Sequence, residues 1–316
     1  MNFIQLVYLK ELSQQGSFSL AAQKLGITQP ALSLQIQKLE EEIGFKLIDR
    51  GKRPLALTSE GEVFFQKSLE ILKMTEQLKS LSIEMADEIK GCLKVGIIPT
   101  LAPYLVPFFI GELKTTYPGL QVEIIEMKTE EIILSLKTGN LDCGILSTPV
   151  VTAGVIFELL FYERFYAYVS ERSRYYSRSK LNIRKLNDED IWYLDEGNCF
   201  QNQVNSICRV KRKTPEEYNL VYKSNSIESL RWIVENQNGI TFIPELATIN
   251  IPPDHEDMIK EIEGEQPVRE ISIALIRNVA RERHINALKN AILRNIPKRM
   301  TEKPDGWVVD TELKIK

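Results

Sequence analysis

Residues 59–90 constrain the fold more than any other part of the sequence. This segment contains no proline and, after Gly61, no glycine. Its apolar residues recur at helical spacing: Phe64, Leu72, Leu78, Leu81 and Met85. A helix this long has too little protein around it to cover its apolar stripe, so we expect it to pair with a second copy of the chain. Packing on its own domain is the alternative.

The residues before this helix read as short helices with little chain between them. The three runs are IQLVYLKELSQQG (4–16), SLAAQKLG (19–26) and TQPALSLQIQKLEEEIG (28–44). Each ends in a glycine, which is a helix-stop signal. Thr28 is a good N-cap, and Pro30 stands in the first turn, where proline is favoured. Helix, tight turn at Gly26 and helix is the helix-turn-helix spacing.

The next run, FKLIDRGKRPLALT (45–58), alternates around a glycine turn as a β-hairpin, or wing, would. It holds four basic residues and one acidic residue between Lys46 and Arg53. Residues 1–90 as a whole carry 11 Lys and Arg against 12 Asp and Glu, and the whole chain carries a net charge of −3. Composition alone therefore argues against a nucleic-acid binder, but the placement of the charges matters more than their sum.

From Leu93 the pattern changes to alternating strands and helices. The strand-like runs are LKVGIIP (93–99), LQVEIIEM (120–127), LDCGILS (141–147), RFYAYVS (164–170), GITFIP (239–244) and ISIALIR (271–277). Helical runs at 102–119 and 129–140 separate the first of them. This alternation predicts a mostly parallel sheet covered by helices, either one large sheet or two small sheets facing a cleft. The last dozen residues read as a loose tail.

Composition and termini bound the class of protein. A length of 316 residues suggests two or three units, and 43% hydrophobic with 26% charged residues is typical of a soluble globular protein. The N-terminus has no secretion signal and no apolar run reaches about 18 residues, so we expect a cytoplasmic protein with reduced thiols. The four cysteines show no C-x-x-C pair, so we expect no zinc, no other metal and no cofactor.

One long stretch resembles a known family. Residues 18–64, FSLAAQKLGITQPALSLQIQKLEEEIGFKLIDRGKRPLALTSEGEVF, are similar to the head of LysR-type transcriptional regulators, with Ile48 where that family usually has phenylalanine. The resemblance implies an α+β multidomain fold. Its parts are a winged helix-turn-helix over 1–58, a dimerising linker helix over 59–90, a two-lobed α/β regulatory domain like periplasmic binding proteins over 91–300, and a tail over 301–316.

Within that family the remainder resembles the OxyR branch, whose members sense hydrogen peroxide. The runs that carry this likeness are GIIPTLAPYLVPFF (96–109), TGNLDCGIL (138–146) and EGNCFQNQVNSIC (196–208). The resemblance implies that Cys199 is oxidised by peroxide and then forms a reversible disulfide with Cys208. It also places Thr100, Thr129 and Arg269 beside the reactive thiol.

The residues around Cys199 fit such a role. Asn198 is a good N-cap and Gln201 stands in a capping-box position, so Cys199 would be the first residue of a helix. The positive end of the helix dipole favours the thiolate, the form that peroxide oxidises. A plain buried cysteine is the alternative. Members of the OxyR branch often have histidine where this chain has Asn198, so the proton for the leaving hydroxide must come from water, a threonine or elsewhere.

Cys208 lies on an apolar stripe of the same helix, with Phe200, Val204 and Ile207. Nine residues of helix rise about 13.5 Å. A disulfide needs Cα atoms within about 7 Å. The two sulfurs can therefore join only if the helix unwinds, which suits a switch better than a structural staple. The basic run 209–213 that follows reads as a solvated turn.

The other candidates in this domain have ordinary alternatives. Thr100 and Thr129 each follow a strand and stand near a helix start, where a threonine can simply be an N-cap. Cys143 in a buried strand and Cys92 at the hinge after the linker helix read as structural.

The third run of the head is the expected recognition helix. Its candidate DNA-contacting residues, with those of the wing, are Gln29, Pro30, Ser33, Gln35, Lys38, Arg50, Lys52 and Arg53. The helix residues would reach base edges and phosphates in the major groove, and the wing residues phosphate or the minor groove. Leu32, Ile36 and Leu39 are expected in the core.

The sequence as a whole predicts a tetrameric, peroxide-sensing transcription activator and not an enzyme. Its expected partners are promoter DNA, further copies of itself, RNA polymerase and a thiol reductant such as a glutaredoxin or thioredoxin, with no membrane. One alternative is a regulator of the same family that answers a small metabolite in the interlobe cleft. A thiol peroxidase and a solute-binding protein are weaker alternatives, because of the DNA-binding head and the missing export signal.

Overall fold

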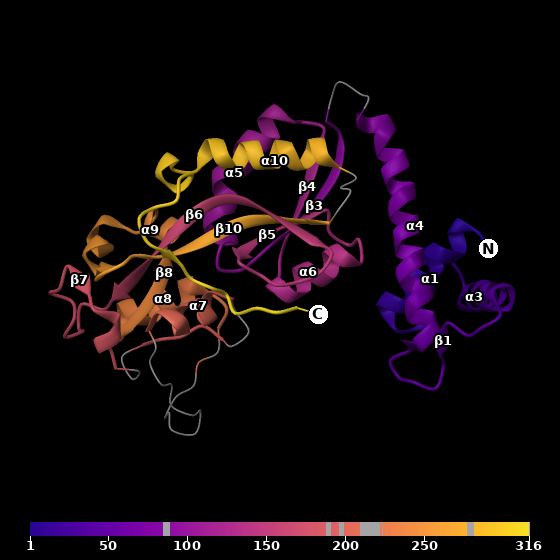
Figure 1. The fold of residues 1–316 in the computed structure, drawn as a ribbon, viewed down its shortest axis with the longest axis horizontal. Coiled ribbons are helices and arrows are strands. Elements are labelled where there is room, and N and C mark those ends of the chain that lie inside the picture. The colour runs from indigo at the N-terminus through magenta and orange to yellow at the C-terminus, as the bar shows by residue number, and fades with distance from the viewer. Residues whose placement is uncertain are drawn as a thin grey trace. The chain divides into compact units, whose positions relative to one another are not determined.

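The computed structural model describes residues 1–84, 89–187, 191–195, 199–208, 222, 224–276 and 281–315. The chain divides into two compact units, Met1–Met85 and Ala86–Lys316, each with its own hydrophobic core (Figure 1). No helix of the described ranges is long and apolar enough to span a membrane.

The first unit is a winged helix-turn-helix followed by a long helix, as the sequence predicts. Its elements are α1 (Phe3–Gln15), α2 (Phe18–Leu25), α3 (Gln29–Ile43), β1 (Ile48–Asp49), β2 (Ala56–Leu57) and α4 (Ser59–Glu84). Gly26 ends α2 in the left-handed conformation, with φ of 68°, which glycine adopts without strain. The Thr28 hydroxyl accepts a hydrogen bond from the Ala31 N–H at 3.4 Å and so caps α3.

The buried Glu40 fixes the wing to α3. One carboxylate oxygen accepts hydrogen bonds from the backbone N–H groups of Leu47 and Ile48, at 2.9 and 3.3 Å. The other pairs with Lys46 at 3.0 Å. Residues 48–49 then pair antiparallel with 56–57 to close the predicted hairpin. The position of the wing is thus set by a carboxylate at the end of the recognition helix.

The long helix is shorter than predicted and leaves apolar side chains in solvent. Within the described chain α4 ends at Glu84, and Ile89 and Lys90, just before the next strand, are not helical. Val63, Met74 and Leu78 are 68%, 66% and 70% exposed. The side chains of Leu81 and Met85 lie outside the described residues.

The second unit alternates strands and helices. The first part runs β3 (Gly91–Ile97), α5 (Ala102–Thr116), β4 (Leu120–Glu126), α6 (Thr129–Lys137), β5 (Cys143–Thr148), β6 (Val155–Val169), β7 (Lys180–Leu181), η1 (Ile183–Lys185) and α7 (Cys199–Cys208). The second part runs α8 (Ile227–Asn236), β8 (Ile240–Pro244), α9 (Glu245–Thr248), η4 (Pro253–Met258), β9 (Ile259–Ile262), β10 (Pro267–Ile276), α10 (Glu282–Asn295), η5 (Lys298–Met300) and β11 (Trp307–Val308).

Two long strands divide this unit into lobes. β3 pairs in parallel with β4 and β5, and β10 lies antiparallel between β5 and β6. Beyond Arg164, β6 continues into a second group and pairs antiparallel with β8 and β9. We call the part built on β3, β4, β5 and β10 lobe I, and the part built on the end of β6 with β7, β8 and β9 lobe II (Figure 1). The predicted mostly parallel sheet is wrong: the sheet is mixed, because a strand-like run reveals no direction.

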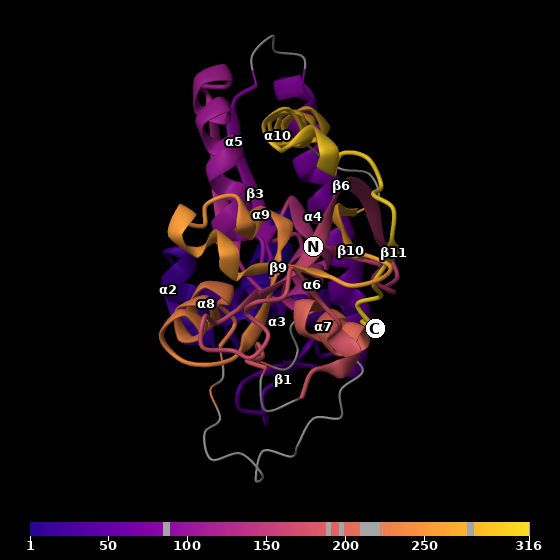
Figure 2. The ribbon, with the colours of Figure 1, turned by 90° about the vertical axis from the view of Figure 1, so that its left-hand side faces the viewer.

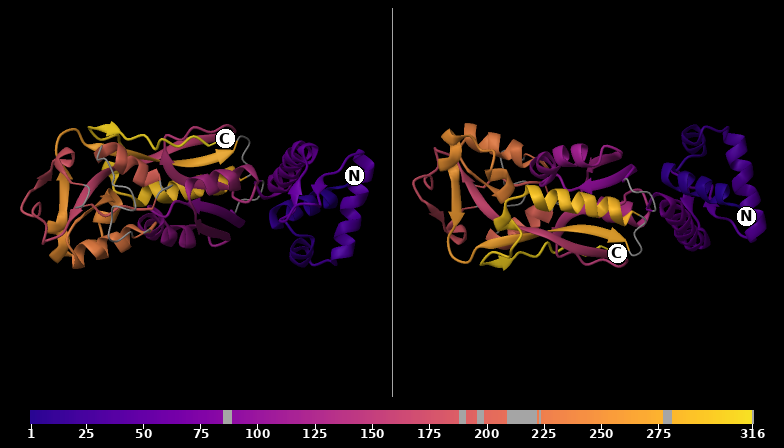
Figure 3. Two further views of the ribbon diagram at one scale, coloured as in Figure 1. Left: turned by 90° about the horizontal axis from the view of Figure 1, so that it is seen from below. Right: turned by 90° about the horizontal axis from the view of Figure 1, so that it is seen from above.

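Helices cover both faces of lobe I. α5 and α10 pack on each other, and α6 lies against β5 and β10 (Figure 2). Seen from above, α10 runs along the long strands (Figure 3). In lobe II, α8 packs on β8, and α7 packs on η1.

The C-terminal residues are packed, so the expectation of a loose tail over 301–316 is wrong. β11 pairs in parallel with the start of β10, and Val309 and Thr311 are fully buried. Val309, Thr311, Leu313 and Ile315 alternate with the exposed Asp310, Glu312 and Lys314, which is a strand signal that the sequence contains. The expectation that Cys92 lies at a hinge after the linker helix is also wrong. It is the second residue of β3 and pairs with Gln121 of β4.

Candidate functional site

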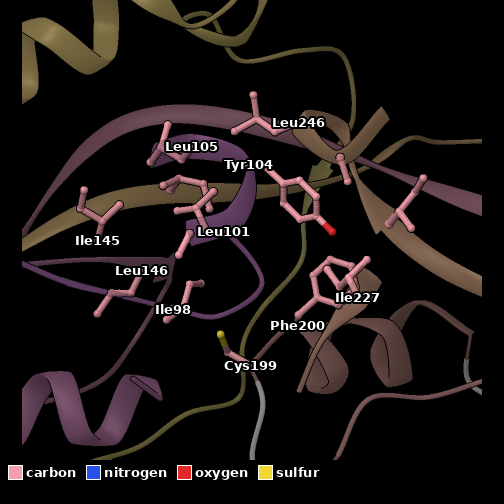
Figure 4. Close-up of a cluster of buried hydrophobic side chains, with 14 of the residues drawn as sticks. Ile98, Leu101, Tyr104, Leu105, Ile145, Leu146, Cys199, Phe200, Ile227 and Leu246 are labelled. Carbon is pink, nitrogen blue, oxygen red and sulfur yellow. The ribbon is translucent and has the colours of Figure 1, made fainter. Parts of the chain in front are cut away.

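Cys199 is the first residue of α7, as predicted, and only 3% of it is exposed. The Thr129 hydroxyl, at the first residue of α6, donates a hydrogen bond to the Cys199 sulfur at 3.5 Å. Ile98, Leu101, Tyr104 and Phe200 belong to the same buried cluster (Figure 4). The expected capping residue Asn198 lies outside the described residues, and Gln201 accepts from the Leu194 N–H at 2.7 Å.

Arg269 forms the second part of the site. It lies on β10 and is fully buried, and its guanidinium donates to the Thr100 hydroxyl and the Thr100 carbonyl, each at 3.3 Å. The guanidinium carbon lies 5.1 Å from the centre of the Phe200 ring, on the residue after Cys199. Thr100, Thr129 and Arg269, predicted from the sequence, are therefore gathered around the start of α7.

Glu163 holds Arg269 in place and was missed by the sequence. The two residues are paired neighbours on β6 and β10, and their side chains join at 2.6 and 2.8 Å. The other Glu163 oxygen accepts from the Leu246 N–H at 3.0 Å. Both side chains are fully buried, so each needs the other to remain charged. A glutamate inside the apolar run of β6 was the only sequence signal for this pair.

The electrostatics of Cys199 contain two opposing effects. Burial raises the pKa of the Cys199 thiol above its ordinary value, while the hydrogen bond from Thr129 and the charge of Arg269 lower it. Burial is the larger effect, so the thiol is protonated at neutral pH in this conformation. The backbone N–H of Phe200 at the helix start also lowers the pKa of the Cys199 thiol, in the direction the sequence predicts, but the burial of the sulfur outweighs it. The Thr129 hydroxyl and the Arg269 guanidinium both stabilise the thiolate against this burial effect.

Tyr104 is a further residue of this region that the sequence did not single out. Its hydroxyl donates to the Glu228 carboxylate at 2.7 Å, which joins α5 of lobe I to α8 of lobe II. Burial and the hydrogen bond to Glu228 raise the pKa of the Tyr104 hydroxyl, so it stays protonated as a donor. Glu228 also binds Arg231 at 2.9 Å. The two lobes are thus connected by a polar contact close to Cys199.

Cys208 is the last residue of α7 and, like Cys199, is 3% exposed. Phe200, Val204 and Ile207 are buried with it, so the predicted apolar stripe is confirmed. The four cysteines, all within described segments, are in the thiol form. Cys143 is fully buried in β5, as predicted. The basic run 209–213 lies outside the described residues.

In the first unit, Gln29, Pro30 and Lys38 are exposed on α3. Ser33 and Gln35 are half-buried, and Gln35 receives hydrogen bonds from the Gln5 amide at 3.4 and 3.5 Å.

Leu32, Ile36 and Leu39 are fully buried, as predicted. Arg50, Lys52 and Arg53 are exposed in the wing, with Arg50 stacked 5.3 Å from the Phe18 ring centre.

Two family models together span most of the chain. Residues 3–62 match the bacterial regulatory helix-turn-helix of the lysR family, and residues 86–296 match the LysR substrate binding domain. The chain belongs to the LysR family of transcriptional regulators. This family consists of DNA-binding regulators that act on promoters, and it is not a family of enzymes.

Individual relatives place the chain near OxyR. A hydrogen peroxide-inducible genes activator from Haemophilus influenzae is 36% identical over 250 residues, 79% of this chain and 82% of that one. A full-length OxyR variant from Pseudomonas aeruginosa superposes with a TM-score of 0.77 at 28% identity, over 94% of this chain and 99% of that one. A reduced OxyR from Porphyromonas gingivalis gives 0.62 at 29% identity, over 68% and 99%.

Proposed function

We propose that this LysR-family regulator senses hydrogen peroxide through Cys199 and Cys208 and activates oxidative-stress genes. The observation that supports it best is the pairing of Cys199 with the Thr129 hydroxyl at one end of α7 and Cys208 at the other end. The relatives named as peroxide-inducible activators support the same signal.

The chemistry consumes one peroxide and two thiols. The Cys199 thiolate attacks one peroxide oxygen, the O–O bond breaks, and the sulfur becomes a sulfenic acid while hydroxide leaves and takes up a proton. The Cys208 thiolate then attacks the sulfenic sulfur, the S–O bond breaks, and hydroxide leaves and is protonated to water. Two thiols and one hydrogen peroxide thus give one disulfide and two waters.

The surrounding residues have distinct roles in this proposal. Thr129 donates to the sulfur and favours the thiolate, and Arg269 adds positive charge. The Thr100 hydroxyl, fixed by Arg269, can hold peroxide or water by a hydrogen bond. With Asn198 at the position before Cys199, the proton for the leaving hydroxide comes from water or a threonine.

The disulfide requires a large rearrangement. An intact α7 separates the two Cα atoms by about 13.5 Å, well beyond the roughly 7 Å that a disulfide spans. Oxidation must therefore unwind α7 and remove Cys208 from the core, where it is buried with Phe200, Val204 and Ile207. Whatever packs on this helix moves with it, which provides the route to the DNA-binding heads.

The regulator acts as an assembly on DNA. The exposed Gln29 and Lys38 of α3 and the basic wing read promoter DNA. Val63, Met74 and Leu78 on α4 form an uncovered apolar stripe that fits a second copy. The exposed Ile110 and Trp232 of the second unit support a further contact between copies, and so a tetramer. We also propose that the regulator contacts RNA polymerase, that a glutaredoxin or thioredoxin reduces its disulfide, and that it is located in the cytoplasm.

Intact mass after thiol alkylation tests the function. One equivalent of hydrogen peroxide is expected to remove two alkylatable thiols from the wild-type protein, with the lost pair mapping to residues 199 and 208. Cys199→Ser should keep its remaining three thiols, and Cys208→Ser should stop at the sulfenic acid. If all four wild-type thiols survive, the cysteines are not the sensor.

A further inference from the structure

The C-terminal residues 307–315, which we call the strap, are bound to the polar face of α7. The Val309 carbonyl accepts a hydrogen bond from the Gln203 amide at 2.8 Å. The Thr311 carbonyl accepts from the Asn202 amide at 3.2 Å, and the Glu312 carboxylate accepts from the Ser206 hydroxyl at 2.7 Å.

The strap is also anchored away from α7. The Val309 N–H donates to the Val268 carbonyl at 2.9 Å, and β11 continues this pairing with β10. The Thr311 hydroxyl donates to the Pro149 carbonyl. The Val151 N–H donates a hydrogen bond to the Leu313 carbonyl at 3.0 Å, and the Val151 carbonyl accepts one from the Ile315 N–H at 2.9 Å. The strap therefore ties α7 to strand β10 and to the segment that follows β5.

α7 is held from two sides as a result. Phe200, Val204 and Ile207 face the hydrophobic core, whereas Asn202, Gln203 and Ser206 face the strap. All three strap-bonding residues lie between Cys199 and Cys208. Ser206 lies four residues after Asn202 and three after Gln203, spacings that place side chains on one side of a helix only while the segment is helical.

We propose that the strap is a positioning element of the switch: it stabilises the helical, dithiol form of α7 and is released when the disulfide forms. This inference rests on the proposed peroxide-sensing function. Closing a loop between Cys199 and Cys208 forces the intervening residues out of the helix, so the three hydrogen bonds to the strap cannot all persist. They therefore stabilise the reduced form alone.

The strap should act on the second chemical step and leave the first unchanged. In that step the Cys208 sulfur bonds to the sulfenic sulfur of Cys199 and water leaves, which requires α7 to open. In the first step peroxide meets Cys199 in its existing pocket, where the Thr129 hydroxyl and Arg269 set its reactivity. Weakening the strap should favour the disulfide and speed its closure.

The test compares two variants of the full-length chain. Asn202→Ala/Ser206→Ala removes two of the strap hydrogen bonds through partly exposed side chains, and the core stripe remains intact. Asn205→Ala is the comparison variant, because it removes one hydrogen bond within α7, from the Gln201 amide to the exposed Asn205, and none to the strap. Each protein is titrated in thiol–disulfide buffers of defined potential, and sulfenic acid formation and disulfide closure are timed separately by alkylation.

We expect the double variant to shift the thiol–disulfide equilibrium about tenfold toward the disulfide, which lowers the midpoint potential by about 30 mV for two electrons. Closure should be faster, whereas sulfenic acid formation should match the wild type. Asn205→Ala should shift the equilibrium less than the double variant, because its contacts with the strap are intact. An unchanged potential in a double variant that still forms the disulfide would overturn the strap's role. If the wild type forms no disulfide at all, the proposed function itself fails, and the strap inference fails with it.

Discussion

Thr129→Val offers the sharpest test of how Cys199 is activated. The substitution removes the hydroxyl that donates to the sulfur at 3.5 Å but keeps the branched shape of a side chain that is 3% exposed. A hydrogen bond to a charged group contributes about 1.5–3 kcal/mol. Since about 1.4 kcal/mol corresponds to a factor of ten, the thiolate population at a fixed pH should fall roughly ten- to a hundredfold.

The consequence is measurable because burial already raises the pKa of the Cys199 thiol. Below that raised pKa, the rate of oxidation is proportional to the small thiolate fraction, so the second-order rate constant with peroxide should fall by the same factor. Stopped-flow measurement across pH would show the activity rising at higher pH in the variant than in the wild type.

Thr129→Ser is the control for this experiment, because it keeps the hydroxyl and loses only a methyl group. Its rate profile should resemble that of the wild type. If Thr129→Val reacts as fast as Thr129→Ser at every pH, the hydrogen bond does not stabilise the thiolate. The activation would then have to be assigned to Arg269 and to the backbone N–H of Phe200.

Three further predictions concern stability and assembly. Arg269→Met leaves Glu163 buried without its charged partner and should lower the free energy of unfolding, measured by urea titration, by about 3–5 kcal/mol. The double variant Arg269→Met/Glu163→Gln should recover most of this loss. Equal losses in the two variants would contradict the coupling of the pair. Burial raises the thiol pKa of both Cys199 and Cys143 above the ordinary 9.0, so the reduced protein binds these protons more tightly than its unfolded chain does. The contribution of these two thiols to its free energy of unfolding should therefore be constant below about pH 9 and fall above it, by up to about 1.4 kcal/mol per pH unit for each thiol, whereas a rise in stability above pH 9 would refute this. Met74→Glu on the exposed stripe of α4 should dissociate the assembly in sedimentation experiments and weaken promoter binding steeply; an unchanged mass would rule out this stripe as the contact.

The DNA-binding head could be predicted almost entirely from the sequence. Its helices end at Gly16 and Gly26 and begin at Thr28, and each of these signals acts over three or four residues. The start of α7 at Cys199 and the buried stripe that includes Cys208 were predictable for the same reason. Local signals of this kind survive in any tertiary context that lets the helix form.

The sign of the Cys199 pKa shift was decided by tertiary structure. The helix start favours a thiolate, but Leu101, just before α5, and Tyr104 on α5 help to enclose the sulfur with apolar groups. Their burial effect outweighs the local one. Desolvation depends on what surrounds a group in space, and helix periodicity cannot report it.

The sequence by itself determined the helices of the DNA-binding head, where the two cysteines stand on α7 and that they cannot join while it is intact. Tertiary structure alone decided their surroundings. Arg269 meets Glu163, and Gln203 meets Val309, each across 106 residues of chain. The directions of β6 and β10 set the first meeting, and the return of the C-terminal strap beside β10 sets the second. Local patterns specify an element and its faces, whereas the partner of each face depends on how distant elements pack.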